Sequence, residues 1–191
     1  MNRSLSAGIL AGGSSIRMGY DKRLLKIGNE TMLSRLVNEL APLDPVVSAP
    51  PEGLSFDPGC PVICEQNEGI GPMEGIRRLL SEANTDDVFC CAADMPLMTI
   101  EAVWCLAELR SREYDCWLFT ENGRIQPLCG IYSRAALPAA EDVIREGRYA
   151  IKAMLDRIRT KLIRIEDTGL DPSILQNINT REEYLKLQNS E

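Results

Sequence analysis

Residues 9–22 read Ile-Leu-Ala-Gly-Gly-Ser-Ser-Ile-Arg-Met-Gly-Tyr-Asp-Lys, and this stretch decides the expected fold. The apolar run from Leu5 to Leu10 is short enough for a buried strand. From Thr31 to Leu40, apolar residues recur at the spacing of one helix face. A strand, a Gly-rich loop with basic residues and a helix follow one another in phosphate-binding loops at the carboxyl end of a parallel strand. We therefore expect an α/β fold.

The residues of this loop suit the binding of phosphate. Gly12 and Gly13 allow the backbone to approach a ligand closely, so that successive N–H groups converge on phosphate oxygens. Arg17 adds a planar, forked cation and Lys22 a point charge. The alternative interpretation is a flexible surface turn that carries two solvated cations.

Two familiar phosphate loops are excluded by spacing. Tyr20 and Asp21 separate Gly19 from Lys22, so the chain lacks the Gly-Lys-Ser/Thr ending of a P-loop. Residues 12–14 read Gly-Gly-Ser and do not match the Gly-x-Gly-x-x-Gly fingerprint of dinucleotide-binding folds.

Composition narrows the class of protein. The 191 residues are most simply one domain, 1–191, and their net charge of −7 makes extended nucleic acid an unexpected partner. No apolar run approaches the roughly 20 residues of a membrane helix, so we expect no membrane association and a cytoplasmic protein. The absence of histidine removes imidazole bases and His-containing metal sites. The scattered cysteines favour reduced core thiols, with a metal pair at Cys60 and Cys64 as the weaker alternative.

The stretch from Leu10 to Lys22, Leu-Ala-Gly-Gly-x-Ser-x-Arg-Met-Gly-x-Asp-Lys, closely resembles the signature of the molybdenum cofactor guanylyltransferases, the MobA-like nucleotidyltransferases. The resemblance implies a three-layer, Rossmann-like nucleotidyltransferase fold with a mostly parallel central sheet and an inserted β-hairpin. It also implies Mg2+-dependent transfer of GMP from GTP to the phosphate of molybdopterin, with release of pyrophosphate. In the family pattern the nucleotide lies against Leu10, Ala11, Gly12, Gly13, Ser14, Ser15 and Lys22, and Arg17 and Lys22 are the catalytic cations.

A second candidate site follows the apolar run at 87–93, which is the clearest buried strand of the chain. Asp94 comes directly after it, where open α/β sheets place their ligands. A carboxylate there suits magnesium, which often takes one or two carboxylates plus substrate phosphates. The alternative is an Asp that starts a turn before Pro96. The resemblance favours the first interpretation, with Asp94 as metal ligand and catalytic residue.

The resemblance also places a nucleotide-binding loop at 65–75. Gly71, Gly75 and Glu65 fall at family positions near the base and ribose, although a tight loop before a helix starting at Pro72 would explain the glycines alone. Two positions depart from the family. The Asn expected near residues 48–50 is absent, and Glu65 replaces an Asp. These departures bear on the choice of base, whereas Gly12 favours guanine, because cytidylyl-transferring relatives usually have Leu-Ala-Ala-Gly.

Further elements are expected along the second half of the chain. Asn122-Gly123 predicts a hairpin, whose return strand contains Pro127 and must therefore be an edge strand or bulged. Arg124 and Gln126 on this hairpin are candidates for the acceptor side. The other expected elements are helices at 99–110, 133–146 and 150–155 and a strand at 160–165.

Near the C-terminus, Asn177-Ile178-Asn179-Thr180 precedes a helix. Thr180 and Glu183 form a capping-box pattern, which could by itself explain the motif. The resemblance instead places Asn177 and Asn179 near the active site, and the two interpretations stay open.

Three hypotheses follow. The first is a guanylyltransferase whose partners are GTP, molybdopterin and molybdenum-insertion or cofactor-delivery proteins. The second is a related transferase that uses CTP or another phosphate acceptor, of the cytidylyl or sugar-phosphate type. The third is a nucleotide-binding protein without turnover. A phosphate monoester nucleophile is already mostly dianionic at pH 7, since its second pKa is about 6, so none of these hypotheses requires a histidine base.

Overall fold

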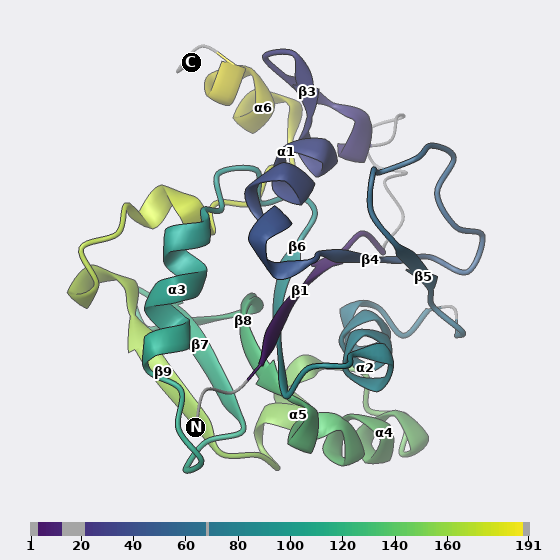
Figure 1. Cartoon of the computed structure of the whole chain (residues 1–191), viewed down its shortest axis with the longest axis vertical. Coiled ribbons are helices and arrows are strands. Elements are labelled where there is room, and N and C mark those ends of the chain that lie inside the picture. The colour runs from purple at the N-terminus through teal and green to yellow at the C-terminus, as the bar shows by residue number, and fades with distance from the viewer. Residues whose placement is uncertain (1–3, 13–21, 68, 189–191) are drawn as a thin grey trace.

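A mostly parallel β-sheet forms the centre of the computed structural model, which describes residues 4–12, 22–67 and 69–188 (Figure 1). Among these residues, seven strands join in the order β5-β4-β1-β6-β8-β7-β9. Their bounds are β1 Leu5–Leu10, β4 Val46–Ala49, β5 Val62–Cys64, β6 Asp87–Ala92, β7 Cys116–Glu121, β8 Arg124–Ser133 and β9 Thr160–Arg164. The helices are α1 Met32–Glu39, α2 Pro72–Glu82, α3 Ile100–Glu108, α4 Leu137–Arg145, α5 Ile151–Leu155 and α6 Arg181–Gln188.

Burial along the strands follows from their place in the sheet. All six residues of β6 are buried, as expected for a strand that is covered by helices on both faces. At the two edges of the sheet, β5 and β9 expose most of their residues. The two apolar runs of the sequence form β1 and β6, which are neighbours in the centre of the sheet. They pair in parallel, from Leu5 with Asp87 to Leu10 with Ala92.

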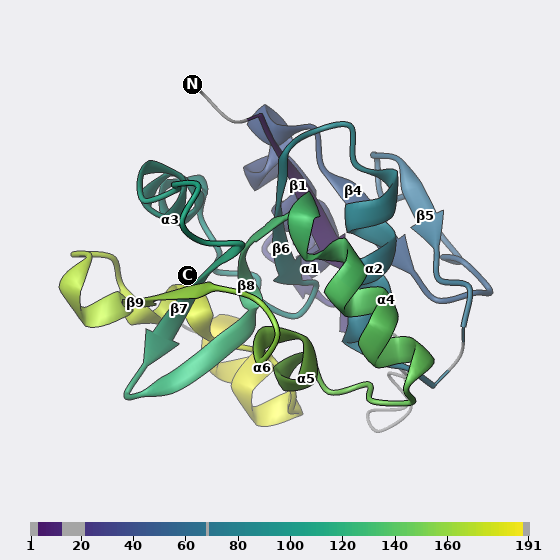
Figure 2. The same ribbon diagram turned by 90° about the horizontal axis from the view of Figure 1, so that it is seen from below.

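Helices cover both faces of the sheet, which gives three layers. One apolar cluster joins α1 and α3 to one face through Leu33, Leu36, Val103 and Leu106. A second cluster joins α2, α4 and α5 to the other face. Figure 2 shows α3 on one side of β1 and β6 and the pair α2 and α4 on the other. The expected three-layer α/β fold with a mostly parallel sheet is confirmed.

The expected hairpin is the pair β7 and β8, and it supplies the antiparallel strand of the sheet. β8 pairs antiparallel with both β6 and β7. β8 is therefore internal from Cys129 to Ser133, whereas Pro127 lies beyond the pairing with β6, so the predicted edge position applies at Pro127 itself. The alternative prediction of a bulge is confirmed, because the register with β7 shifts between Leu118 and Thr120, opposite the segment that contains Pro127. The Tyr132 hydroxyl donates to the Pro127 carbonyl at 2.6 Å and supports this irregular stretch.

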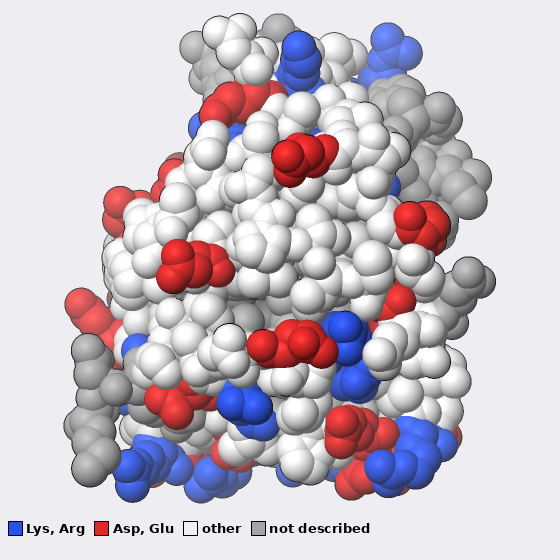
Figure 3. All heavy atoms as spheres, turned by 45° about the vertical axis from the view of Figure 1, so that its right-hand side comes forward, with Lys and Arg blue, Asp and Glu red and all other residues white. Residues whose placement is uncertain are grey.

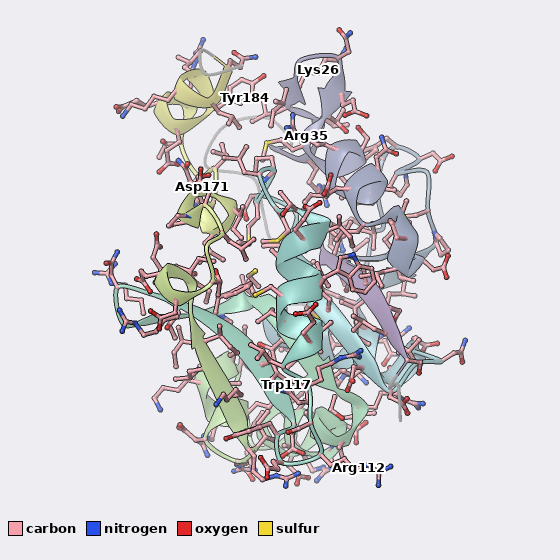
Figure 4. The ribbon with its side chains drawn as sticks, turned by 60° about the vertical axis from the view of Figure 1, so that its left-hand side comes forward. Lys26, Arg35, Arg112, Trp117, Asp171 and Tyr184 are labelled. Atoms are coloured by element: carbon pink, nitrogen blue, oxygen red, sulfur yellow. The ribbon has the colours of Figure 1, made fainter. Side chains whose placement is uncertain are left out.

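Two short elements after the Gly-rich loop were not expected from the sequence. A 3-10 turn at Lys22–Leu24 leads into a small hairpin of β2 (Lys26–Ile27) and β3 (Glu30–Thr31). Helix α6 packs on this hairpin, and the two lie side by side at the top of Figure 1. Figure 4 labels Tyr184 and Lys26, where the Tyr184 hydroxyl donates to the Lys26 carbonyl at 2.6 Å. The C-terminal helix thus braces the segment that follows the loop.

Helix starts follow local capping chemistry. Thr31 caps α1 through a reciprocal pair of hydrogen bonds with Ser34. Ser133 caps a 3-10 turn at Arg134–Ala136, so the helix expected from 133 begins as an α-helix only at Leu137. The described residues contain no helix that is long and apolar enough to cross a membrane.

Candidate functional site

Four parallel strands, β5, β4, β1 and β6, end at one side of the sheet. The backbone continues their ladder just beyond the strands: Ala11 N–H donates to the Ser48 carbonyl at 2.8 Å, and Ala93 N–H donates to the Leu10 carbonyl at 3.0 Å. Glu65 N–H donates to the Ala49 carbonyl at 2.8 Å. We call these strand ends the carboxyl edge, formed by residues 10–12, 48–49, 65 and 92–94. Open α/β sheets bind their ligands at such an edge.

At the carboxyl edge, the Glu65 carboxylate lies between two glycines. Its Oε1 is 2.5 Å from the position that a Cβ would occupy on Gly12, and 3.1 Å from the corresponding position on Gly75. The Ser48 hydroxyl is 3.2 Å from that same position on Gly75. The space beside Gly12 is therefore filled by the Glu65 carboxylate, whereas beside Gly75 the nearest atom is Leu10 Cδ2, at 2.6 Å, with Glu65 and Ser48 next. The structure brings together three segments that the sequence analysis treated separately.

Electrostatics set Glu65 apart from an ordinary surface carboxylate. Only 9% of its surface is exposed. Burial raises the pKa of the Glu65 carboxyl to about 7, and the neighbouring Glu74 carboxylate contributes in the same direction. The fully buried Ser48 hydroxyl lies close enough to lower this pKa slightly, but the two groups do not form a well-aligned hydrogen bond. None of the salt bridges between described side chains involves Glu65.

The neighbouring carboxylate, Glu74, has a different role. It lies in the first turn of α2 and accepts from the Arg77 guanidinium at 2.8 Å and from Gln66 N–H at 3.1 Å. Burial opposes ionisation, but these bonds, with Arg77 first, lower the pKa of Glu74. Glu74 therefore anchors the segment after Glu65 to the helix. Gly71 ends this segment at the N-terminus of α2 with φ of 74°, a conformation that suits glycine.

Asp94 lies at the end of β6 and is held to the C-terminal segment. The Asp94 carbonyl accepts from Ile178 N–H at 2.8 Å. Because Ile178 stands between Asn177 and Asn179, the predicted Asn-Ile-Asn motif lies beside the predicted metal ligand. The backbone that carries both asparagines is thus brought to the carboxyl edge.

The capping interpretation of the same motif is confirmed. Glu183 Oε2 accepts from the N–H groups of Asn179 at 2.7 Å and Thr180 at 2.8 Å. In return, Glu183 N–H donates to the Thr180 hydroxyl at 3.2 Å. The capping box fixes where α6 begins, and this in turn holds Ile178 against Asp94.

Arg23 is a residue at this edge that the sequence analysis did not select. Its Nη1 donates to the Ala11 carbonyl at 2.8 Å. The only sequence signal was a second cation directly after Lys22, and nothing in the pattern showed that it reaches back to β1. The contact becomes visible only in three dimensions.

Several predicted residues fall outside this description. Gly13, Ser14, Ser15 and Arg17 lie outside the described residues, as does the side chain of Lys22.

The acceptor-side candidates Arg124 and Gln126 lie on β8, with Arg124 paired opposite Glu121 next to the hairpin turn.

The donor set at the carboxyl edge is made of oxygen atoms. No group of three or more Cys, Asp or Glu side chains with metal-site geometry occurs among the described residues. One carboxylate, Asp94, at a strand end fits a hard cation that completes its shell with water and substrate phosphates. Among the side chains coloured in Figure 3, acidic and basic groups are interspersed and form no continuous basic stripe.

Comparison with known proteins agrees with this arrangement. The MobA-like NTP transferase domain matches residues 7–162. A protein of Carboxydothermus hydrogenoformans described as "Probable molybdenum cofactor guanylyltransferase" is 32% identical over 190 residues, which cover 97% of this chain and 95% of the relative. The "Molybdenum cofactor guanylyltransferase" of Syntrophotalea carbinolica is 31% identical over 188 residues, covering 95% of this chain and 89% of the relative.

Solved structures share the fold. Molybdopterin-guanine dinucleotide biosynthesis protein A from Archaeoglobus fulgidus superimposes with a TM-score of 0.81 at 19% identity, over 97% of each chain. The 2-C-methyl-D-erythritol 4-phosphate cytidylyltransferase of Thermus thermophilus gives a TM-score of 0.72 at 15% identity, over 100% of this chain and 98% of the other. With the family match spanning most of the sequence, the chain belongs to the MobA-like NTP transferase family, a family of nucleotidyltransferases.

Proposed function

We propose that this protein transfers GMP from GTP to the phosphate of molybdopterin and releases pyrophosphate. The observation that carries the proposal is the meeting of Gly12, Glu65 and Gly75 at the end of β1, beside Asp94 at the end of β6. These are positions at which the sequence resembles molybdenum cofactor guanylyltransferases, and two relatives above 30% identity carry that name.

In this proposal the nucleotide lies across the carboxyl edge. Glu65 accepts from the N–H groups on the edge of guanine or from the ribose, and Ser48 supplies a neighbouring buried hydroxyl. The backbone N–H groups from Gly12 onward bind the β- and γ-phosphates. Arg17 and Lys22 offset charge on the α-phosphoryl group and on the departing pyrophosphate. For these two cations the support is the sequence resemblance.

Magnesium is the proposed metal, and Asp94 would hold it together with substrate phosphates. The bound ion would neutralise phosphate charge and help to align the two substrates. The chain's own contribution is to hold the backbone of Asp94 at the end of β6, and the bond from Ile178 N–H to the Asp94 carbonyl supports this.

Catalysis then rests on alignment and charge rather than on a base. The attacking phosphate monoester is mostly dianionic at neutral pH, because its second pKa is about 6. Holding that oxygen in line with the α-phosphorus supplies much of the rate acceleration in phosphoryl transfer. The absence of histidine from the chain is consistent with this chemistry.

The acceptor is proposed to bind toward the C-terminal half of a single domain. Asn177 and Asn179 flank the residue that contacts Asp94, and Arg124 and Gln126 lie on the inserted hairpin. Molybdopterin is oxygen-labile, so direct delivery from and to other cofactor-handling proteins is part of the proposal. The seven free thiols fit a reducing compartment such as the cytoplasm.

A second candidate, a cytidylyltransferase or a transferase with another acceptor, is favoured by two residues. Ser48 stands near where the family has an Asn, and Glu65 is one methylene longer than the usual Asp. Both side chains lie together at the carboxyl edge, so these two changes alter one surface.

The test is a turnover assay with molybdopterin and Mg2+, using GTP, CTP and ATP in parallel. Pyrophosphate release and a product heavier by one GMP are expected with GTP. Turnover with CTP in place of GTP would replace the first candidate with the second. Nucleotide binding without any pyrophosphate release would contradict both.

A further inference from the structure

Arg23 ties the chain that follows the Gly-rich loop to the chain that precedes it. Its Nη1 donates to the Ala11 carbonyl at 2.8 Å across twelve positions of sequence. Arg23 belongs to the 3-10 turn Lys22–Leu24, so the backbone of Lys22 is placed by the same contact. A bond that closes a segment of this length offsets part of the entropy cost of bringing its two ends together.

The peptide group that Arg23 holds is the one that leads into the loop. A trans peptide is planar, and its C=O and N–H point in opposite directions. No cis peptide occurs among the described residues. An Arg23 guanidinium that fixes the direction of the Ala11 carbonyl therefore also fixes the direction of the Gly12 N–H. That N–H is the first donor available to a phosphate bound by this loop.

Two other contacts hold the same dipeptide from different sides. Ala11 N–H donates to the Ser48 carbonyl at 2.8 Å. The Glu65 carboxylate packs against Gly12, where it fills the space of the missing Cβ. β4 thus holds the Ala11 N–H, Glu65 packs against Gly12, and Arg23 binds the Ala11 carbonyl. The Ala11–Gly12 peptide is thus preorganised before any ligand arrives.

We propose that Arg23 is a positioning residue for the nucleotidyl transfer: by binding the Ala11 carbonyl it orients the Gly12 N–H toward the phosphates of the nucleotide. The proposal rests on the proposed function. It assigns to Arg23 an effect through the backbone of residues 11–12. Arg23 is therefore distinct from Arg17 and Lys22, which are proposed to offset phosphate charge directly.

The test compares Arg23→Met, Arg23→Lys and the control Arg134→Met. Methionine keeps most of the length and apolar contact of the arginine but has no N–H donor. Arg134 is an exposed arginine whose backbone lies beside Asp86, at the opposite end of β6. For each variant, kcat and KM for Mg–GTP, the Kd for GTP and the Tm are measured at low and high salt.

We expect Arg23→Met to lower kcat/KM by about tenfold or more, with a fall in kcat as well as a rise in KM, because small misplacements of reacting groups are costly. Arg23→Lys, which keeps a charged donor, recovers part of the loss, and Arg134→Met behaves as wild type. The loss persists at high salt, since a direct hydrogen bond is screened little.

An Arg23→Met enzyme with wild-type kcat/KM per folded molecule would overturn the proposal. A defect that disappears at high salt would also overturn it, because it would show a long-range charge effect instead of a bond to Ala11. A wild-type protein that binds nucleotide without turnover would refute the proposed function alone. In that case the Kd for GTP in the same variants still decides the role of Arg23.

Discussion

Two buried carboxylates at opposite ends of the central sheet, Asp87 and Glu65, differ in how they are paired. At the amino end of β6, Asp87 is fully buried and forms a salt bridge of 3.0 Å with Arg110, whose side chain is only 10% exposed. Beside it, Ser4 and Asp86 bond each other through side chain and backbone. These charged and polar groups are matched with protein partners.

At the carboxyl edge, the buried side chains of Glu65 and Ser48 lack such partners among the described residues. Glu65 is buried with no salt-bridge partner among the described side chains, and its pKa is raised to about 7. The buried Ser48 hydroxyl beside it makes no well-aligned hydrogen bond with a described residue. Leaving such groups unmatched costs stability, which a protein tolerates where a ligand completes the bonding. The contrast between Asp87 and Glu65 supports the proposal that the carboxyl edge binds a ligand.

The largest expected effect is at Asp94. Replacing it by Asn keeps the shape of the side chain but removes the negative charge proposed to hold magnesium. We expect kcat/KM with GTP to fall by about 10²–10³-fold, a loss typical of removing one group that stabilises a transition state. The free energy of unfolding should change by less than about 1 kcal/mol. An active Asp94→Asn enzyme would contradict the assignment.

The matched change at the other end of the same strand is Asp87→Asn. It leaves Arg110 as a largely buried, unpaired cation, and we expect a loss of about 3 kcal/mol in the free energy of unfolding. Denaturant titration measures this loss. Activity per folded molecule should remain close to wild type, and a strong loss of activity here would break the contrast between the two ends.

A smaller effect is expected at Gly12. A Cβ at this position would lie 2.5 Å from Glu65 Oε1, so Gly12→Ala must displace the carboxylate. We expect a destabilisation of about 1–3 kcal/mol and a higher KM for GTP. In a Glu65→Ala background the same change should cost much less stability, because the clashing group is gone. Equal costs in both backgrounds would show that Glu65 and Gly12 do not share this space.

A pH-dependent effect is expected at Glu65. Its pKa is raised in the folded protein, so the folded state holds this proton more tightly than the unfolded chain does. Stability therefore falls as pH rises from about 4.5 to about 7, by at most about 1.4 kcal/mol per pH unit. Glu65→Gln should flatten this part of the profile, whereas Glu113→Gln, at an exposed position, should leave it unchanged. If the stability of Glu65→Gln and of the wild type fell in parallel with pH, Glu65 would not be the source of this pH dependence.

The sequence predicted those features that depend on local pattern. The apolar runs at 5–10 and 87–93 located two central strands, Asn122-Gly123 located the hairpin, and Thr180 with Glu183 located the start of the last helix. Each of these signals is contained in a few neighbouring residues, so no knowledge of the tertiary structure was needed.

The features that could not be predicted depend on contacts between distant segments. The two-residue strands β2 and β3 carry no periodicity, and packing against α6 holds them in place. Glu65 became a buried, unmatched carboxylate only because Gly12 and Gly75 approach it from two other elements. The internal position of β8 from Cys129 to Ser133 depends on its pairing with β6, whereas Pro127 lies beyond that pairing.

The central claim, that the carboxyl edge is a guanine nucleotide site completed by Asp94, is tested most directly by equilibrium binding. Titration calorimetry with GTP, CTP and ATP in the presence of Mg2+ should be carried out on the wild-type protein and on Asp94→Ala. The account predicts that GTP binds at least about tenfold more tightly than CTP and ATP, a difference of about 1.4 kcal/mol, and that the variant weakens GTP binding. Equal affinities, a preference for CTP, or GTP binding unaffected by Asp94→Ala would contradict it.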